Sequence, residues 1–174
     1  MEAGTFPTSY ISTTTGAVGR SQDNCGISPA NTAGWFVSPL GSWFAEVALF
    51  GNASNNNGRI VAVIPGNSTP LYVLPALTLG EFDGVGAINT VNAITPNVVT
   101  KAASSWVVGR STLCLNGGTL VASAALTQGY AAVTTSGVRF MGSNVAAEVI
   151  SGYLRRVRYW PRALTDVEMQ TVTT

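Results

Sequence analysis

The two acidic residues of "EFD", Glu81 and Asp83, form the arrangement in this chain that comes nearest to a catalytic one. Side chains two residues apart point to the same side of a β-strand, so both carboxyl groups would face one neighbour. Hydrolysis of a glycosidic bond needs two carboxyl groups that flank the bond, one of which donates a proton. Whether this pair can act in that way depends on the fold that positions it.

Other catalytic and metal-binding chemistry is limited by the residue types present. The chain contains no histidine, which excludes Ser-His-Asp and Cys-His catalysis and zinc sites built on imidazole. Cys25 and Cys114 are too few for a thiolate metal site, and we expect both to be free and at least partly buried. Calcium needs several clustered oxygen ligands. The acidic residues are instead scattered along the chain, as Glu2, Asp23, Glu46, Glu81, Asp83, Glu148, Asp166 and Glu168. We expect neither a metal nor a cofactor.

Binding of a sugar requires an exposed aromatic ring beside amide or carboxylate groups. Trp35, Trp43 and Trp106 are candidates for such a platform, although packing in a core or between sheets is the more frequent role of this residue type. The loop "NASNNN" that starts at Asn52 offers side-chain amides. The hypothesis for a glycan site combines one tryptophan with this loop, and its residues are Trp35, Asn55, Asn56 and Asn57.

The amino-acid composition limits the kinds of partner that the protein can bind. Of the 174 residues, 46% are hydrophobic and only 10% are charged, and the formal net charge is +1. No long-range field therefore attracts nucleic acid or an anionic membrane surface. A weakly charged surface resists association poorly, so we expect a homo-oligomer or a component of a larger assembly. No run of about 18 apolar residues is present, and we expect no membrane insertion.

Short strand-like runs separated by turn clusters are typical of an all-β sandwich or barrel. The expected strands are Trp43 to Phe50, Arg59 to Ile64, Leu71 to Leu79, Trp106 to Val108, Ser111 to Leu115, Thr119 to Ala124, Val138 to Met141 and Tyr153 to Trp160. Asn116-Gly117-Gly118 predicts a hairpin turn, because Asn and Gly accept positive φ angles readily. We expect one sandwich domain over residues 25–174, preceded by an extended lead-in over residues 1–24.

The closing strand has an unusual pattern, because strict alternation leaves neither of its faces apolar. A bulge at Arg155-Arg156 resolves this, since it turns Leu154 and Val157 inward and the arginines outward. Pro161 then ends the strand, because it has no N–H to donate. Solvated arginines are the favoured interpretation. The alternative is a ligand-binding patch made of Arg155, Arg156, Arg158 and Arg162.

The end of the chain is the only segment that predicts a helix. Thr165 and Glu168 have the spacing of a capping box, in which each side chain accepts a hydrogen bond from the other residue's backbone N–H. Leu164, just before the cap, can pack on Met169. We expect about two helical turns.

Three blocks of sequence carry a family resemblance. The closing segment "GYLRRVRYWPRALTDVEMQTVTT" resembles the last strand and short acidic helix of concanavalin A-like (laminin G-like) jelly-roll domains. Together with the lead-in from Glu2 to Ser28 and the block "SSWVVGRSTLCLNGGTLVAS", it resembles the C-terminal domains of tailed-bacteriophage tail and tail-fibre proteins. The resemblance implies a concanavalin A-like jelly-roll β-sandwich with an extended N-terminal lead-in and a short C-terminal helix.

The resemblance also implies a function. We expect a non-enzymatic virion structural protein, a tail or tail-fibre surface module for assembly and host attachment. The alternatives are a capsid decoration or head-fibre protein and a carbohydrate-binding module. Glucanases of this fold carry Glu-x-Asp-x-x-Glu, but Gly86 stands at the third acidic position here. Glu81 and Asp83 are therefore interpreted as a solvated strand end, and we expect no enzymatic activity.

Partners and location follow from the same resemblance. It implies contacts with other virion proteins, a homo-oligomer with a trimer favoured by family analogy, and a host surface glycan as a further partner. We expect no nucleic acid partner, because the arginines of the closing segment are its only support. The expected location is the virion, assembled in the cytoplasm of the bacterial host.

Overall fold

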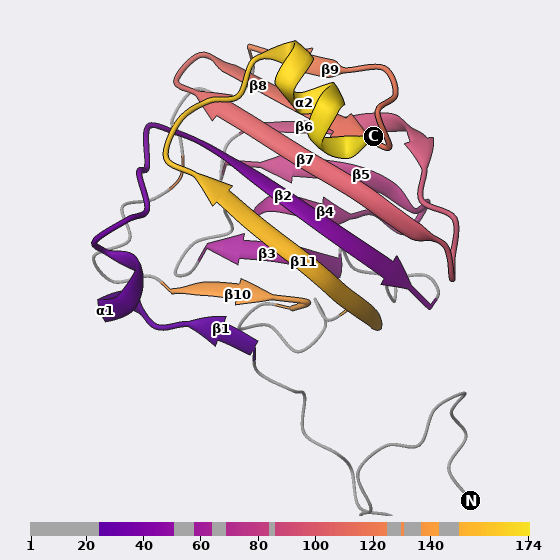
Figure 1. Ribbon diagram of the computed structural model, residues 1–174, viewed down its shortest axis with the longest axis horizontal. Coiled ribbons are helices and arrows are strands. Elements are labelled where there is room, and N and C mark those ends of the chain that lie inside the picture. The colour runs from indigo at the N-terminus through magenta and orange to yellow at the C-terminus, as the bar shows by residue number, and fades with distance from the viewer. Residues whose placement is uncertain are drawn as a thin grey trace, which may run out of the picture.

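The computed structural model describes residues 25–50, 58–63, 69–83, 86–124, 130, 137–142 and 150–174. These residues form two stacked antiparallel sheets and a short C-terminal helix, which confirms the expected all-β sandwich (Figure 1). The elements are β1 Cys25–Ile27, α1 Pro29–Thr32, β2 Leu40–Leu49, β3 Gly58–Val63, β4 Thr69–Val73, β5 Thr78–Phe82, β6 Ala87–Ala93, β7 Val99–Val107, β8 Arg110–Leu115, β9 Val121–Ser123, β10 Val138–Phe140, β11 Gly152–Trp160 and α2 Asp166–Thr173.

The chain crosses between the sheets several times. Sheet A has the strand order β1-β10-β3-β4-β5-β6, and sheet B has the order β11-β2-β7-β8-β9. The closing strand β11 therefore lies beside β2, although more than 100 residues separate them in the sequence. In Figure 1, sheet B lies in front of sheet A, and the yellow helix α2 lies over β7 and β8. One face of each sheet thus points to the other sheet, and the second face points outward.

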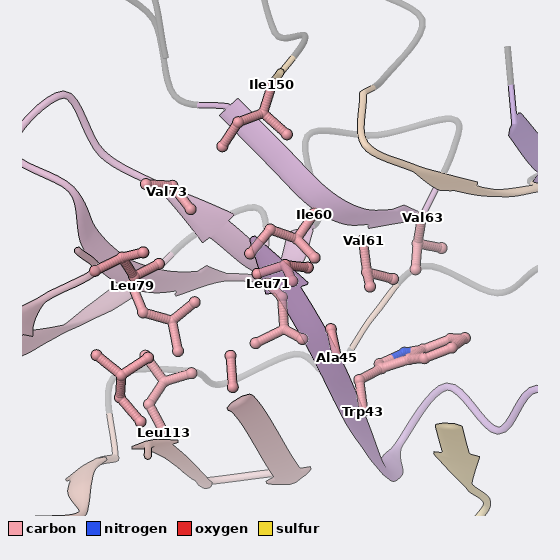
Figure 2. Packing of buried hydrophobic residues seen from close by; sticks show 14 of the residues in the cluster. Trp43, Ala45, Ile60, Val61, Val63, Leu71, Val73, Leu79, Leu113 and Ile150 are labelled. Atoms are coloured by element: carbon pink, nitrogen blue, oxygen red, sulfur yellow. The ribbon is translucent and has the colours of Figure 1, made fainter. Parts of the chain in front are cut away.

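The hydrophobic core fills the space between the two sheets. Figure 2 shows how side chains of β2, β3, β4 and β5 meet there. Leu49, Ile60, Leu71 and Leu79 are completely buried, and Trp43 is 1% exposed. Burial of each such side chain contributes about 1.5–3 kcal/mol, so this layer dominates the stability of the domain.

The bulge expected in the closing strand is present. Leu154 pairs with Val47 and Arg156 pairs with Glu46, so the register shifts by one residue at Arg155. After the shift, Val157 faces the core as Leu154 does. The arginines point outward and are exposed. Because β11 is an edge strand, these charges also disfavour pairing with the edge of another sheet.

The expected helix and its capping box are confirmed. The Glu168 backbone N–H donates to Thr165 Oγ1 at 3.3 Å, and the Thr165 N–H donates to Glu168 Oε2 at 2.8 Å. Arg162 donates to the same carboxylate, and these contacts lower the pKa of Glu168 to about 2. Leu164 and Met169 are both buried in a small cluster on the outer face of sheet B. The helix is therefore fixed both at its cap and along its apolar side.

The turn expected at Asn116-Gly117-Gly118 is also confirmed. Asn116 has a φ of 49° and Gly117 a φ of 65°, and the turn joins β8 to β9. The loop expected over residues 52–58 lies outside the described residues except for Gly58, the first residue of β3.

Two strand predictions are wrong. The segment expected as one strand from Leu71 to Leu79 forms β4 and β5, joined by a turn in which Leu77 has a φ of 62°. Pro75 was the signal for this turn, because proline is unsuited to the middle of a sheet. The strand expected from Trp106 begins at Val99, since pairing with β2 and β8 holds a stretch of small and polar residues whose own β propensity is low.

Three elements were not expected at all: β1, β6 and α1. α1 is only four residues long and starts at Pro29, where the absent N–H of proline is not needed. Both cysteines are free, as expected, but only Cys114 is buried. Cys25 is exposed, because it lies on the short edge strand β1, so the expectation that it would be partly buried is wrong.

Candidate functional site

The acidic pair lies inside the protein, which overturns its interpretation as a solvated strand end. Glu81 is 0% exposed and Asp83 is 5% exposed. Glu81 lies two residues after the core residue Leu79 on β5, so its side chain points into the sandwich. Asp83 follows the strand, and its Oδ1 accepts a hydrogen bond from the Gly86 N–H at 2.8 Å. The carboxyl groups therefore do not meet a saccharide that arrives from solvent. The absence of enzymatic activity stays a prediction.

Glu81 instead fixes Tyr130, which lies in the segment between β9 and β10. The Tyr130 hydroxyl donates to Glu81 Oε1, and the Tyr130 backbone N–H donates to the Ser38 carbonyl at 3.2 Å. Burial raises the pKa of Glu81 to about 8, against the opposing effect of Ser111 and Tyr130. Burial and the neighbouring carboxyl also raise the pKa of Tyr130 well above its usual value. The pair is an internal anchor that favours a protonated carboxyl group.

The tryptophans form an aromatic cluster at one end of the sandwich. Trp43 and Trp106 are 1% and 2% exposed, which confirms packing as their role. Trp35 is partly buried, and its ring lies 6.1 Å from Trp43 and 5.1 Å from Tyr159. Its Nε1–H donates to the Asn31 carbonyl at 2.6 Å, so the protein itself uses the polar group that a sugar would need.

The structure does not bring Trp35 to the ends of the asparagine loop. Asn55, Asn56 and Asn57 lie outside the described residues, but the flanking residue Phe50 is described. Trp35 packs near Trp43, whereas Phe50 follows the far end of β2, seven residues and about 23 Å away. The aromatic neighbour of Phe50 is Tyr153 on β11.

Tyr72, on the outer face of sheet A, is not a better platform. The ring of Tyr72 lies across Gly80, where an added Cβ would be 2.3 Å from the tyrosine Cζ. Its hydroxyl donates to Asn89 Oδ1 at 3.0 Å, and the Arg59 guanidinium lies 5.6 Å from the ring centroid. Tyr72 is only 4% exposed, so a ligand cannot stack on it.

The outer face of sheet B is different, because polar and apolar side chains lie there in rows across β11, β2 and β7, and those of Tyr153, Val99, Arg156 and Arg158 are exposed. The strand register defines three rows, which are Tyr153-Ala48-Val99, Arg156-Glu46-Lys101 and Arg158-Phe44-Ala103. Neighbouring rows are about 7 Å apart and neighbouring strands about 5 Å apart. The helix α2 packs on Phe44 and Ala103 in the third row.

Tyr153 is the exposed aromatic ring of this face. It is 49% exposed, and the ring of Phe50 supports it edge-on, with centroids 4.8 Å apart and an interplanar angle of 89°. Val98 and Val99 are 51% and 40% exposed beside the same row. A half-exposed ring that a second ring supports is the arrangement that a stacking ligand needs.

The second and third rows carry positive charge. Arg155 forms an ion pair with Glu46 at 3.1 Å. Within the described part of the chain, Lys101, Arg156 and Arg158 form no ion pair. We call Tyr153, Glu46, Lys101, Arg155, Arg156 and Arg158 the cationic face. One carboxylate against four cations leaves this face strongly positive, although the whole chain has a net charge of only +1.

Sequence reasoning missed Tyr153 as a site residue. A signal was present, because alternation along the strand turns Tyr153 outward when its neighbour Leu154 points inward. The sequence did not reveal that β11 pairs with β2, or that Lys101 lies on the strand beyond.

The described residues show neither a cluster of metal-binding side chains nor a helix that could span a membrane. No group of three or more Cys, Asp or Glu residues in the described ranges could hold a metal ion. No described helix is long and apolar enough to cross a membrane.

The two sheets and the helix on sheet B define a concanavalin A-like sandwich, a fold that comparison with solved structures also shows. The CBM40 of the Ruminococcus gnavus IT-sialidase, bound to α2,3 sialyllactose, is similar with a TM-score of 0.65 and 15% identity, over 86% of this chain and 92% of that one. A heptameric SAP-like pentraxin from Limulus polyphemus gives 0.56 and 16%, over 86% and 73%. A putative carbohydrate-binding protein from Bacteroides ovatus gives 0.64 and 16%, over 84% and 43%.

These comparisons show the fold alone. No protein-family model matches the chain, and no curated protein matches it in sequence. The expected concanavalin A-like fold is therefore confirmed, while the narrower resemblance to bacteriophage tail proteins stays a prediction.

Proposed function

We propose that this domain is a non-catalytic carbohydrate-binding module that uses the cationic face. The observation that supports this most directly is Tyr153, an aromatic ring that is 49% exposed and supported by Phe50. The C–H groups of a sugar ring can stack on such a ring, while charged groups in the next row, Arg156 and Lys101, bind the sugar's polar substituents.

The fold supports this function together with the site, because one fold hosts many functions. Similar sandwiches include a CBM40 in complex with sialyllactose and a putative carbohydrate-binding protein. The burial of Glu81 and Asp83 supports the non-catalytic part of the proposal, since neither carboxyl group is placed to donate a proton to a bound glycan.

A glycan array that includes acidic and neutral oligosaccharides tests the proposal. The wild-type chain should bind at least one of them, and Tyr153→Ala should weaken that binding about tenfold or more. Val167→Ala is the matched control, because this side chain is 72% exposed on α2 and does not belong to the cationic face. A blank array, or binding that Tyr153→Ala leaves unchanged, would contradict the proposal.

Trp35 remains the rival platform, and the same array separates the two. Trp35→Phe keeps an aromatic ring in the cluster while it removes the Nε1–H bond to Asn31. We expect this variant to bind glycans as the wild type does. Loss of binding in Trp35→Phe with intact binding in Tyr153→Ala would move the site to the other end of the sandwich.

As a second proposal, this carbohydrate binding attaches a bacteriophage virion to its host. The three sequence blocks that resemble tail and tail-fibre proteins support it. In the structure, one block forms the end of β7 with β8 and β9, and another forms β11 and α2. Mass spectrometry of separated phage heads and tails tests it. Detection in tails supports the tail module, many copies on heads would indicate the decoration protein, and detection in neither would contradict both.

A further inference from the structure

The cationic face differs from the other exposed cations of the described chain. Arg110 donates two hydrogen bonds to Asp166, at 2.7 and 2.9 Å, and Arg162 forms a similar pair with Glu168. Acidic partners are thus present where arginines anchor α2. On the cationic face, Glu46 forms its ion pair with Arg155 and lies between Arg156 and Lys101 in the strand register, so a single carboxylate faces four cations there.

Protection of a sheet edge explains only part of this pattern. Charged side chains on an edge strand prevent unwanted pairing, which accounts for Arg156 and Arg158 on β11. Lys101 does not fit that explanation, because β7 lies in the interior of sheet B, between β2 and β8. It is also the only lysine in the chain. Lys101 lies directly opposite Glu46, whose ion pair is with Arg155, so the charge of Lys101 adds to that of Arg156 and Arg158 on this face.

The dimensions of the face suit a saccharide with negative groups. Arg156 and Arg158 are about 7 Å apart along β11, and Lys101 is about 10 Å from Arg156 across β2. Tyr153 lies one row away, within the length of a short oligosaccharide. A guanidinium group binds carboxylate or sulfate through two parallel hydrogen bonds, and an ammonium group adds a point charge.

From this placement we infer that the ligand of the cationic face is an anionic saccharide, whose carboxylate or sulfate groups bind Arg156, Arg158 and Lys101 while a sugar ring stacks on Tyr153. This inference rests on the proposed function and specifies its ligand class. A nucleic acid offers similar anions. The cationic face has one exposed ring and the chain a net charge of only +1, so a glycan fits the observations better.

Paired ligands test the inference directly. Binding of the full chain is measured to sialyllactose and lactose, to oligogalacturonate and its carboxyl-reduced form, and to dextran sulfate and dextran. At least one acidic member should bind about tenfold more tightly than its neutral counterpart. The first two pairs report on carboxylates and the third on sulfates. Raising the salt from about 50 mM to about 500 mM should weaken the acidic member selectively.

Two double variants that lose the same charge at different places show whether the preference for acidic saccharides depends on the cationic face. Arg156→Gln combined with Arg158→Gln should reduce the acidic preference to within about twofold. Arg110→Gln combined with Arg162→Gln removes the same charge beside α2 and should retain the preference. Equal loss in both double variants would mean that overall charge, and not this face, selects the ligand.

The outcomes separate this inference from the proposed function. If acidic and neutral members bind equally and Tyr153→Ala still abolishes binding, the module binds carbohydrate and the inference about anions is wrong. If no member of any pair binds, both are wrong. Binding of single-stranded oligothymidine as tight as that of the best acidic saccharide would also overturn the inference.

Discussion

Replacement of Glu81 by glutamine should remove most of the pH dependence of stability between pH 5 and pH 8. The wild-type carboxyl group is completely buried, and burial raises its pKa from 4.5 to about 8. In the unfolded chain it ionises near its ordinary pKa, whereas in the folded chain it keeps its proton until about pH 8. Its contribution to stability is therefore complete below pH 4.5 and is lost as the pH rises toward 8.

The size of this effect follows from the pKa difference. Each pKa unit corresponds to about 1.4 kcal/mol, which gives an upper bound of about 5 kcal/mol. Relaxation of the interior around an ionised carboxylate lowers this figure, and we expect a loss of about 2–4 kcal/mol from pH 5 to pH 8. The range from pH 5 to pH 8 is well suited to this measurement, because the chain has no histidine, the side chain that ordinarily titrates in that range.

Urea unfolding at a series of pH values provides the assay. The free energy of unfolding of the wild type should fall across the window, while that of Glu81→Gln should stay nearly constant, since an amide does not titrate. The glutamine oxygen can still accept the hydrogen bond of Tyr130. Glu168→Gln serves as the control, because the pKa of Glu168 lies at about 2, below the window. A flat wild-type profile, or a slope that persists in Glu81→Gln, would refute the reasoning.

Two further predictions concern local elements. Among three single variants, Leu164→Ala should destabilise the protein most, by about 2–3 kcal/mol, because it leaves a cavity under α2. Thr165→Ala removes the helix cap and should cost about 1 kcal/mol of stability. Arg156→Ala should change the stability by no more than about 0.5 kcal/mol, because this side chain is exposed. Denaturant melts give this order, and Arg156→Ala as the most damaging change would show a structural role for that arginine. Gly117→Val should destabilise by about 1–2 kcal/mol, because valine is strained at a φ of 65° and its Cβ would lie 2.7 Å from Thr174 Oγ1; an unchanged melting temperature would contradict this.

Features that depend on a few neighbouring residues could be predicted from the sequence. The capping box needs only Thr165 and Glu168, and the hairpin turn needs only the φ angles that Asn116 and Gly117 accept. The bulge in β11 followed from the need to bury Leu154 and Val157 together. In each case the physical cause acts within one turn or one strand, so the local sequence contains all of it.

The candidate site depended on contacts between distant parts of the chain. Alternation showed that Glu81 and Asp83 share a side of their strand, but only the packing of sheet A on sheet B showed that this side is the core. In the same way, Tyr153 and Lys101 are 52 positions apart in sequence and share one face because β2 pairs with both of their strands. Strand order is set by burial of the whole core, to which every strand contributes, and no local pattern encodes it.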